Sequence, residues 1–157
     1  MHDEQNWELD LSMSDNKNKE NLKDMAIINF DGACSGNPGK MGIGALIRYN
    51  EGIKKISEMI GVCTNNIAEY SSLIESLKFV LKLNVKKVII YGDSKLVINQ
   101  LFGTWNVKND HIYKLWNEAK TLIEHLIKKG VKVEGSWIPR ELNKEADRLS
   151  TDAIHLK

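Results

Sequence analysis

Four short segments of this sequence each place an acidic residue in polar or glycine-rich surroundings, at Asp31, Glu69, Asp93 and Asp147. Carboxylates that come close together repel one another and raise one another's pKa unless cations lie among them. Hard oxygen ligands prefer Mg²⁺ or Mn²⁺ to zinc. Two such ions about 4 Å apart can activate a water molecule and stabilise the leaving oxygen of a phosphodiester. Together, the four acids predict a two-metal site for phosphodiester hydrolysis.

Each acid taken alone also has a structural interpretation. Asp31 precedes a glycine and could form a turn, and Asp93 could cap the helix predicted to follow it. Glu69 could complete a capping box with Asn66, three residues earlier. Asp147 lies inside a predicted helix, where aspartate is only a modest helix former, which favours a role outside helix formation.

Hydrophobic periodicity predicts the elements that must position these acids. Three strands with short connections indicate an antiparallel meander, and a continuous apolar run predicts a strand buried on both faces. The order β-β-β-α-β-α-α-β-α predicts an α/β fold with a mixed five-stranded sheet flanked by helices. The predicted strands are 25–31, 42–49, 53–62, 87–91 and 131–137. The predicted helices are 66–83, 94–102, 111–129 and 143–154.

The acids fall at the ends of these elements. Asp31 and Asp93 stand at the carboxyl ends of the first and fourth predicted strands, and Glu69 and Asp147 fall in the first turns of predicted helices. If the two strands are parallel neighbours, their ends flank a crevice, the usual ligand position in open α/β sheets. The sequence therefore predicts that folding gathers distant carboxylates at one rim of the sheet.

Composition indicates a globular domain that follows an acidic segment. The chain has 157 residues, of which 42% are hydrophobic and 27% charged, with a net charge of +1. Residues 1–24 contain seven acidic side chains against three lysines, which leaves a net charge of +5 on residues 25–157. We predict a disordered acidic extension over 1–24 and a catalytic domain over 25–157. The alternation of apolar and polar residues over 7–13 also suits a short element that adds a strand to a partner.

Other features bear on the setting of the protein. No apolar run approaches the roughly 20 residues of a membrane helix, and the first residues lack a secretory signal pattern. Cys34 and Cys63 have no Cys-x-x-Cys spacing, so they predict neither a disulfide framework nor a zinc site. We expect a cytoplasmic monomer with no membrane partner.

Read together, the motifs are highly specific in their order along the chain. They are Asp31-Gly32-x-Cys34-x-Gly36-Asn37-Pro38-Gly39, Thr64-Asn65-Asn66-x-x-Glu69, Asp93-Ser94 and Asn143-x-x-Ala146-Asp147-x-Leu149. Over residues 25–153 the chain resembles type 1 ribonuclease H. The resemblance implies a ribonuclease H-like fold and an endonuclease that hydrolyses the RNA strand of RNA–DNA hybrids, leaving 5′-phosphate and 3′-hydroxyl ends. It assigns two Mg²⁺ ions, for which Mn²⁺ can substitute, to the four acids.

The resemblance also implies contacts with the hybrid. Cys34, Asn37, Asn65 and Asn66 match positions that contact its minor groove. A short amide can reach base edges there, as well as the 2′-hydroxyl that distinguishes RNA from DNA. Helix capping is the structural alternative for Asn65 and Asn66.

Two departures from the family's pattern concern substrate binding. Arg140 stands about where many members place a histidine, and its permanent charge suits phosphate but not proton transfer. The basic protrusion of many members is missing, because residues 103–109 join two helices directly, as expected for the family's compact subgroup. We therefore expect Trp105 to stack on the DNA backbone and Lys108 to contact phosphates. A position in the core is the alternative for Trp105.

The predicted function is therefore a hybrid-specific endoribonuclease, and activity on double-stranded RNA stays open for a member of the compact subgroup. A catalytically silent module that binds RNA–DNA hybrids is the alternative, which the presence of all four acids disfavours. A proofreading-type exonuclease needs Asp-x-Glu on its first strand. The sequence here is Asp31-Gly32-Ala33, which argues against that activity.

Overall fold

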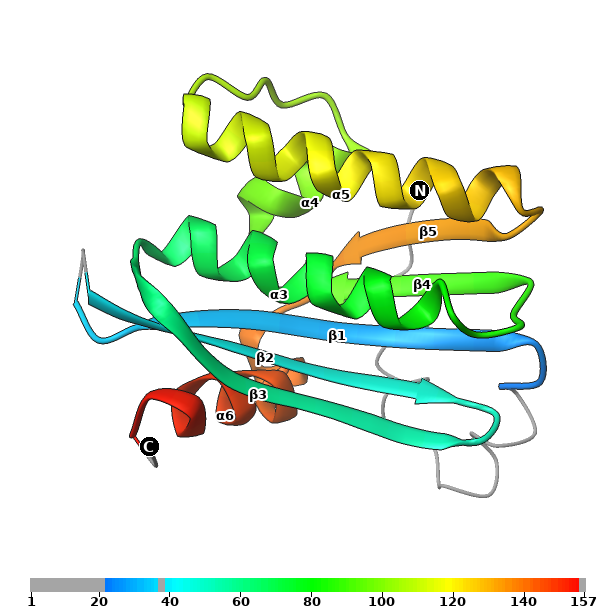
Figure 1. Ribbon diagram of the computed structural model, residues 1–157, viewed down its shortest axis with the longest axis horizontal. Coiled ribbons are helices and arrows are strands. Elements are labelled where there is room, and N and C mark those ends of the chain that lie inside the picture. Colours follow the sequence, from blue (N-terminus) through cyan, green and yellow to red (C-terminus); the bar gives the residue numbers. More distant parts are fainter. Residues whose placement is uncertain (1–21, 37–38, 156–157) are drawn as a thin grey trace.

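The computed structural model describes residues 22–36 and 39–155 (Figure 1). The predicted extension, apart from residues 22–24, and the alternating segment 7–13 lie outside these ranges. Residues 22–24 form a turn in which Leu22 is buried. The carbonyl of Asp24 accepts hydrogen bonds from the backbone N–H groups of Lys86 and Lys87, so this turn contacts the main body.

Within the described residues, five strands form one mixed sheet in the order β3-β2-β1-β4-β5. The strands are β1 (Met25–Cys34), β2 (Gly39–Tyr49), β3 (Gly52–Cys63), β4 (Lys87–Gly92) and β5 (Lys132–Trp137). The pairs β1–β2 and β2–β3 are antiparallel, whereas β1–β4 and β4–β5 are parallel. The predicted mixed sheet is thereby confirmed, including the change from antiparallel to parallel pairing at β1.

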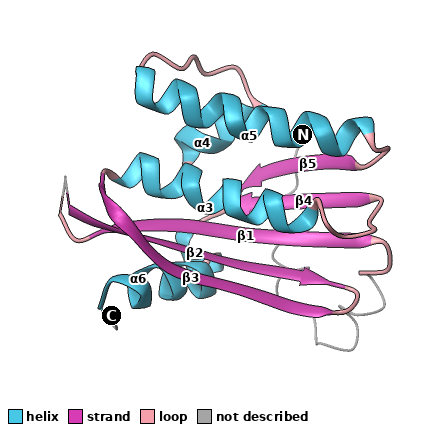
Figure 2. Ribbon diagram, viewed as in Figure 1, coloured by secondary structure: helices cyan, strands magenta, loops and turns pink. Residues whose placement is uncertain are grey.

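The helices cover both faces of this sheet (Figure 2). They are α3 (Asn65–Val80), α4 (Lys95–Phe102), α5 (Asp110–Lys128) and α6 (Lys144–His155). The first three share one core with the sheet, in which Phe30, Ile43 and Leu77 are buried. The α6 helix packs on the other face, against β1, β2 and β3. A single 3₁₀ turn, η1 (Arg140–Leu142), precedes α6 and was not predicted.

The β1 strand is longer than predicted. Its pairing with β2 continues past Asp31 through Gly32, Ala33 and Cys34, so these residues belong to the strand, beyond its predicted end at residue 31. Asp31 lies opposite Gly44 in this register and has a strand backbone. The interpretation of Asp31 as a turn-forming residue is therefore wrong, because its neighbours on β2 extend the ladder on both sides of it.

The contact between β2 and α6 depends on a glycine. A Cβ atom added to Gly44 would overlap backbone atoms of Ala146 and Ser150, so α6 approaches the sheet as closely as a bare backbone allows. We expect Gly44→Ala to lower the free energy of unfolding by about 1–3 kcal/mol, because the helix must move away from the sheet. Denaturant titration measures this change. Unchanged stability would show that α6 can shift at no cost.

Candidate active site

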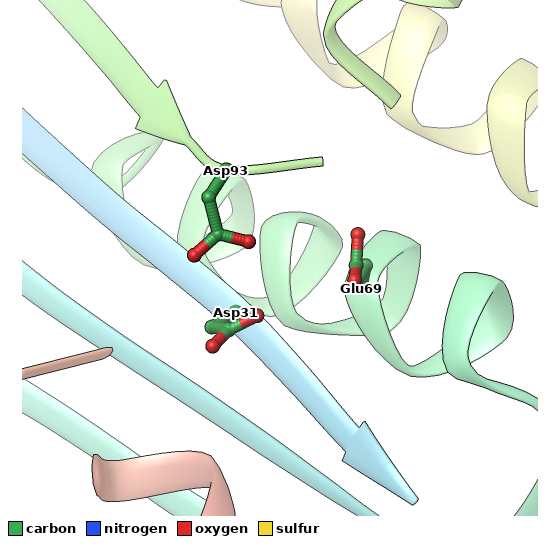
Figure 3. Close-up of side chains that lie close together, drawn as sticks. All are labelled: Asp31, Glu69 and Asp93. Atoms are coloured by element: carbon green, nitrogen blue, oxygen red, sulfur yellow. The ribbon is translucent and has the colours of Figure 1, made fainter. Parts of the chain in front are cut away.

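Three carboxylates converge at the rim of the sheet (Figure 3). Asp31 comes from β1, Glu69 from α3 and Asp93 from the end of β4, and each offers an oxygen within 4.8 Å of the others. The parallel register explains part of this arrangement, because Phe30 and Gly92 are Cα partners and an acid follows each of them. The predicted meeting of Asp31 and Asp93 beside neighbouring parallel strands is confirmed, but Asp31 lies inside β1, which continues to Cys34, and not at the predicted strand end.

Glu69 reaches this position because α3 packs closely on β1. A Cβ atom on Gly32 would overlap the backbone of Ala68 and Glu69, so the missing side chain lets the helix approach beside Asp31. The helix begins at Asn65 with Thr64 as its N-cap, and its first turn contains no acidic residue. The capping-box interpretation of Glu69 is therefore wrong, and so is its predicted place in the first turn.

Asp93 is not a helix cap either. The side chain of Ser94 accepts a hydrogen bond from the backbone N–H of Val97 at 3.2 Å, and Ser94 is the N-cap of α4. One oxygen of Asp93, Oδ2, instead accepts a hydrogen bond from Nδ2 of Asn143 at 3.1 Å. Capping is thus done by the next residue along the chain, which leaves the Asp93 carboxylate at the rim of the sheet.

Asp147 completes the group from the opposite face of the sheet. It lies in the first turn of α6, as predicted, and lines the same cavity of about 390 Å³ as Asp31, Glu69 and Asp93. The Oδ1 atom of Asp147 is 3.6 Å from a guanidinium nitrogen of Arg140. The structure therefore brings all four acids of the sequence motifs to one cavity, with three of them in closer contact.

Burial and crowding make these carboxylates hard to ionise together. Burial, reinforced by the charges of Asp93 and Glu69 and by contact with Asp147, raises the pKa of Asp31 from 3.8 to about 9. Burial also raises the pKa of Glu69 to about 7, against the effect of a hydrogen bond with Ser94. For Asp93 burial raises the pKa, while the hydrogen bond from Asn143 opposes the change. Protonation or a bound cation is needed to relieve this crowding.

The donor set fits a divalent cation of the hard type. All of the convergent ligand atoms are carboxylate oxygens, the ligands that Mg²⁺ and Mn²⁺ prefer. Among the described residues none donates a hydrogen bond to Oε2 of Glu69, although that oxygen is buried. A buried oxygen without a donor is costly unless a cation or water satisfies it. The residues present therefore match the ions that the sequence motifs predict.

Five of the seven residues predicted to bind substrate line two adjoining cavities. Cys34, Asn65 and Arg140 line the cavity of the acids. Asn66 and Lys108 line a second cavity of about 660 Å³, which Asn65 also lines, between the start of α3 and the segment joining α4 to α5. Neither asparagine caps α3, since Thr64 is the N-cap, so the capping alternative is wrong for both.

The two remaining predicted contacts have different outcomes. The side chain of Trp105 is 49% exposed, which contradicts the alternative that it fills the core. Its backbone N–H donates to the carbonyl of Asn99 at 3.1 Å, so the residue is held at the end of α4. Asn37 lies outside the described residues, and its predicted role stays a prediction.

Sequence reasoning missed several residues around the acids. Thr151 and His155 line the cavity together with Asp147. Their spacing of four and eight residues from Asp147 places all three on one face of α6, and this spacing was a usable signal. Asn143 was noted only as part of a motif, although it is a buried partner of Asp93. Because an asparagine just before a helix is typical of a helix cap, nothing in the sequence indicated a contact with Asp93.

Comparison with known proteins identifies the family. A family model described as reverse transcriptase-like matches residues 29–153. A ribonuclease H from Thermoanaerobacter pseudethanolicus is 34% identical over 143 residues, which cover 83% of this chain and 90% of that protein. The chain belongs to the ribonuclease H family. A bifunctional protein of Mycobacterium tuberculosis is 36% identical over 131 residues, and the match covers 82% of this chain but only 35% of that longer relative.

Solved ribonuclease H structures share the fold. The RNase H1 of the halophilic archaeon Halobacterium salinarum superposes with a TM-score of 0.76 at 30% identity, over 85% of this chain and 99% of that one. LC11-RNase H1, solved in complex with an RNA/DNA hybrid, gives a TM-score of 0.73 at 31% identity, over 83% and 97%. The ribonuclease H-like fold expected from the motifs is therefore confirmed. Among the described helices, none is long and apolar enough to cross a membrane.

Proposed function

We propose that this protein is an endoribonuclease that hydrolyses the RNA strand of RNA–DNA hybrids. The convergence of Asp31, Glu69 and Asp93, with Asp147 in the same cavity, carries the proposal. Membership of the ribonuclease H family supports the substrate, since a related RNase H1 has been solved with an RNA/DNA hybrid. Cleavage that leaves 5′-phosphate and 3′-hydroxyl ends belongs to the proposal as an expectation from the family.

The four acids would hold two Mg²⁺ ions, with Mn²⁺ as a substitute. Such ions, when bound, neutralise the carboxylates, activate the attacking water and stabilise the leaving oxygen of the phosphodiester. The chain's own contribution is to hold its oxygens in place from two faces of one sheet. Asp31 and Asp93 stand on neighbouring strands, while α3 and α6 present Glu69 and Asp147 from opposite sides. This preorganisation avoids moving charged groups during the reaction.

The remaining cavity residues would position the hybrid. Cys34 and Asn65 line the walls beside the acids, where a minor groove would place its 2′-hydroxyls. Arg140, whose side chain is largely exposed at the rim, and Lys108 in the adjoining cavity offer positive charge to phosphates. The exposed ring of Trp105 would stack on the DNA backbone. These contacts replace the basic protrusion that the sequence lacks.

A panel of matched duplexes tests the proposal. RNA–DNA, RNA–RNA and DNA–DNA duplexes of one sequence are incubated with Mg²⁺, with Mn²⁺ or with chelator, and the products are sized. We expect internal cleavage of the RNA in the hybrid with either metal, and no cleavage in chelator. Closed circular hybrids, which have no free ends, establish that cleavage is endonucleolytic.

The other outcomes of the panel separate the rivals. Hybrid that is bound but never cut would replace the proposal with the silent binding module. Cleavage confined to strand ends would indicate an exonuclease instead. Cleavage of RNA–RNA duplexes besides the hybrid would extend the substrate class to double-stranded RNA while keeping the same site.

A further inference from the structure

A buried amide pair lies behind the carboxylates. Asn29, on β1 two residues before Asp31, is 4% exposed, and Asn143, just before α6, is 1% exposed. The Nδ2 atom of Asn29 donates a hydrogen bond to Oδ1 of Asn143 at 3.1 Å. The bond joins residues that are 114 positions apart in the sequence. It thereby connects the strand that carries Asp31 to the segment that leads into α6.

The direction of the Asn143 amide matters for Asp93. Its Nδ2 donates to the backbone carbonyl of Phe30 at 2.9 Å and to Oδ2 of Asp93 at 3.1 Å. An asparagine amide has a donor end and an acceptor end. If the amide of Asn143 were reversed, its oxygen would face a carbonyl and a carboxylate, and both contacts would become repulsive. The hydrogen bond from Asn29 holds Oδ1 of Asn143 away from Asp93. It thereby keeps Nδ2 of Asn143 directed at the Asp93 carboxylate.

The stability of the fold does not explain why an asparagine is buried at position 29. Its Cα neighbours in the sheet are Leu46 and Tyr91, and Tyr91 belongs to the same buried hydrophobic cluster as Ile138. Its own Oδ1 is buried with no hydrogen-bond partner among the described residues. A buried acceptor without a donor costs free energy, which an apolar residue of the same size would avoid. A side chain that is costly for packing but directed at a functional amide indicates a role in the site.

We propose that Asn29 is a positioning residue for Asp93. It acts through Asn143 by orienting the amide that holds one oxygen of the Asp93 carboxylate, and it thereby raises the affinity of the acid group for a divalent cation. Groups that orient a metal ligand tune the metal affinity without touching the ion. The inference rests on the proposed function only in that these carboxylates bind Mg²⁺ or Mn²⁺.

The test uses Asn29→Leu in the full chain, because leucine keeps the approximate size and removes the donor. Calorimetric titration of the chelator-treated protein with Mn²⁺ and with Mg²⁺ gives the dissociation constants. We expect Asn29→Leu to bind roughly 3- to 10-fold more weakly, at or below the low end of the 10- to 100-fold loss typical of direct outer-shell partners. The matched control is Asn117→Leu, at an exposed position on α5, which should bind as the unmodified chain does.

A double-mutant cycle separates the relay from a general packing effect. In an Asn143→Ala background, Asn29→Leu should cause no further loss of metal affinity, because its only route to Asp93 is gone. An equal loss in both backgrounds would overturn the proposal, and so would unchanged affinity of Asn29→Leu. Melting in chelator checks folding. If Asn29→Leu does not fold, Asn29→Ala removes the donor without adding bulk and is judged by the same criteria.

The failure of this inference is distinct from failure of the proposed function. If the unmodified chain binds metal and Asn29→Leu binds equally well, only the role of Asn29 is refuted. If the unmodified chain binds neither Mn²⁺ nor Mg²⁺, the proposed metal site and the role of Asn29 are both refuted. Neither measurement requires the hybrid or the cleavage reaction.

Discussion

Asp31→Asn is expected to reduce cleavage of RNA–DNA hybrids by about three orders of magnitude or more while the fold is retained. The amide has nearly the shape of the carboxylate but carries no charge, so the central ligand of the acid group is lost. A metal ion contributes several kcal/mol of charge stabilisation in such reactions, and each 1.36 kcal/mol corresponds to a tenfold change in rate. Single-turnover cleavage with saturating Mg²⁺ measures the effect.

The matched control for this variant is Asp152→Asn. Asp152 lies on α6, where its carboxylate pairs with Arg148 at 2.9 Å, and it does not belong to the acid group. The same change of one oxygen to nitrogen should leave cleavage within about twofold, since surface ion pairs contribute little. Cleavage by Asp31→Asn at the rate of this control would refute the assignment of the acid group as the catalytic site.

The second large effect concerns stability. Without metal, we expect the protein to become less stable as the pH rises from about 4 to about 9. In the folded chain Asp31 holds its proton up to a pKa of about 9, whereas its ordinary value is 3.8. Glu69 behaves likewise between 4.5 and about 7. Between these values the folded state binds more protons than the unfolded state, so the free energy of unfolding falls with increasing pH.

Asp31→Asn and added Mg²⁺ should both oppose this loss. The variant has no carboxyl group to ionise at position 31, so its melting temperature in chelator should exceed that of the unmodified chain by an amount that grows with pH. Mg²⁺ binds the ionised form and should stabilise the unmodified chain more at alkaline than at acidic pH. Melting curves at about pH 5, 7 and 9 measure both effects. A constant difference between the two chains across this range would contradict the expectation.

The fold could be predicted well because the spacing of apolar residues indicates which segments form strands and which form helices. The continuous apolar residues of β4 fit a central strand of a sheet that helices cover on both faces (Figure 2), and Gly103 and Gly130 directly follow the predicted helices 94–102 and 111–129. The errors lie where local patterns compete with pairing across the sheet. Gly32 looks like a turn residue, but pairing with Ile43 keeps it in β1. The 3₁₀ turn before α6 has no periodicity that a sequence pattern could reveal.

The acids could be predicted because each stands in a short motif of the sequence, but their surroundings could not. The hydrogen bond between Asn29 and Asn143 joins distant residues with unremarkable local patterns, and only the folded chain shows it. The capping role of Ser94 was not predicted, because the sequence allows either Asp93 or Ser94 to cap α4. Contacts between distant residues could therefore be found only in the structure, whereas the acidic residues of short motifs could be predicted from the sequence.

The close seating of α6 on Gly44 has a consequence for when this protein can act. The last helix supplies Asp147, and the segment before it supplies the amide that steadies Asp93. A partly opened molecule in which this helix has lifted away would keep its sheet yet have an incomplete set of ligands. The proposed cleavage therefore depends on the docking of α6, because only the docked helix completes the set of ligands.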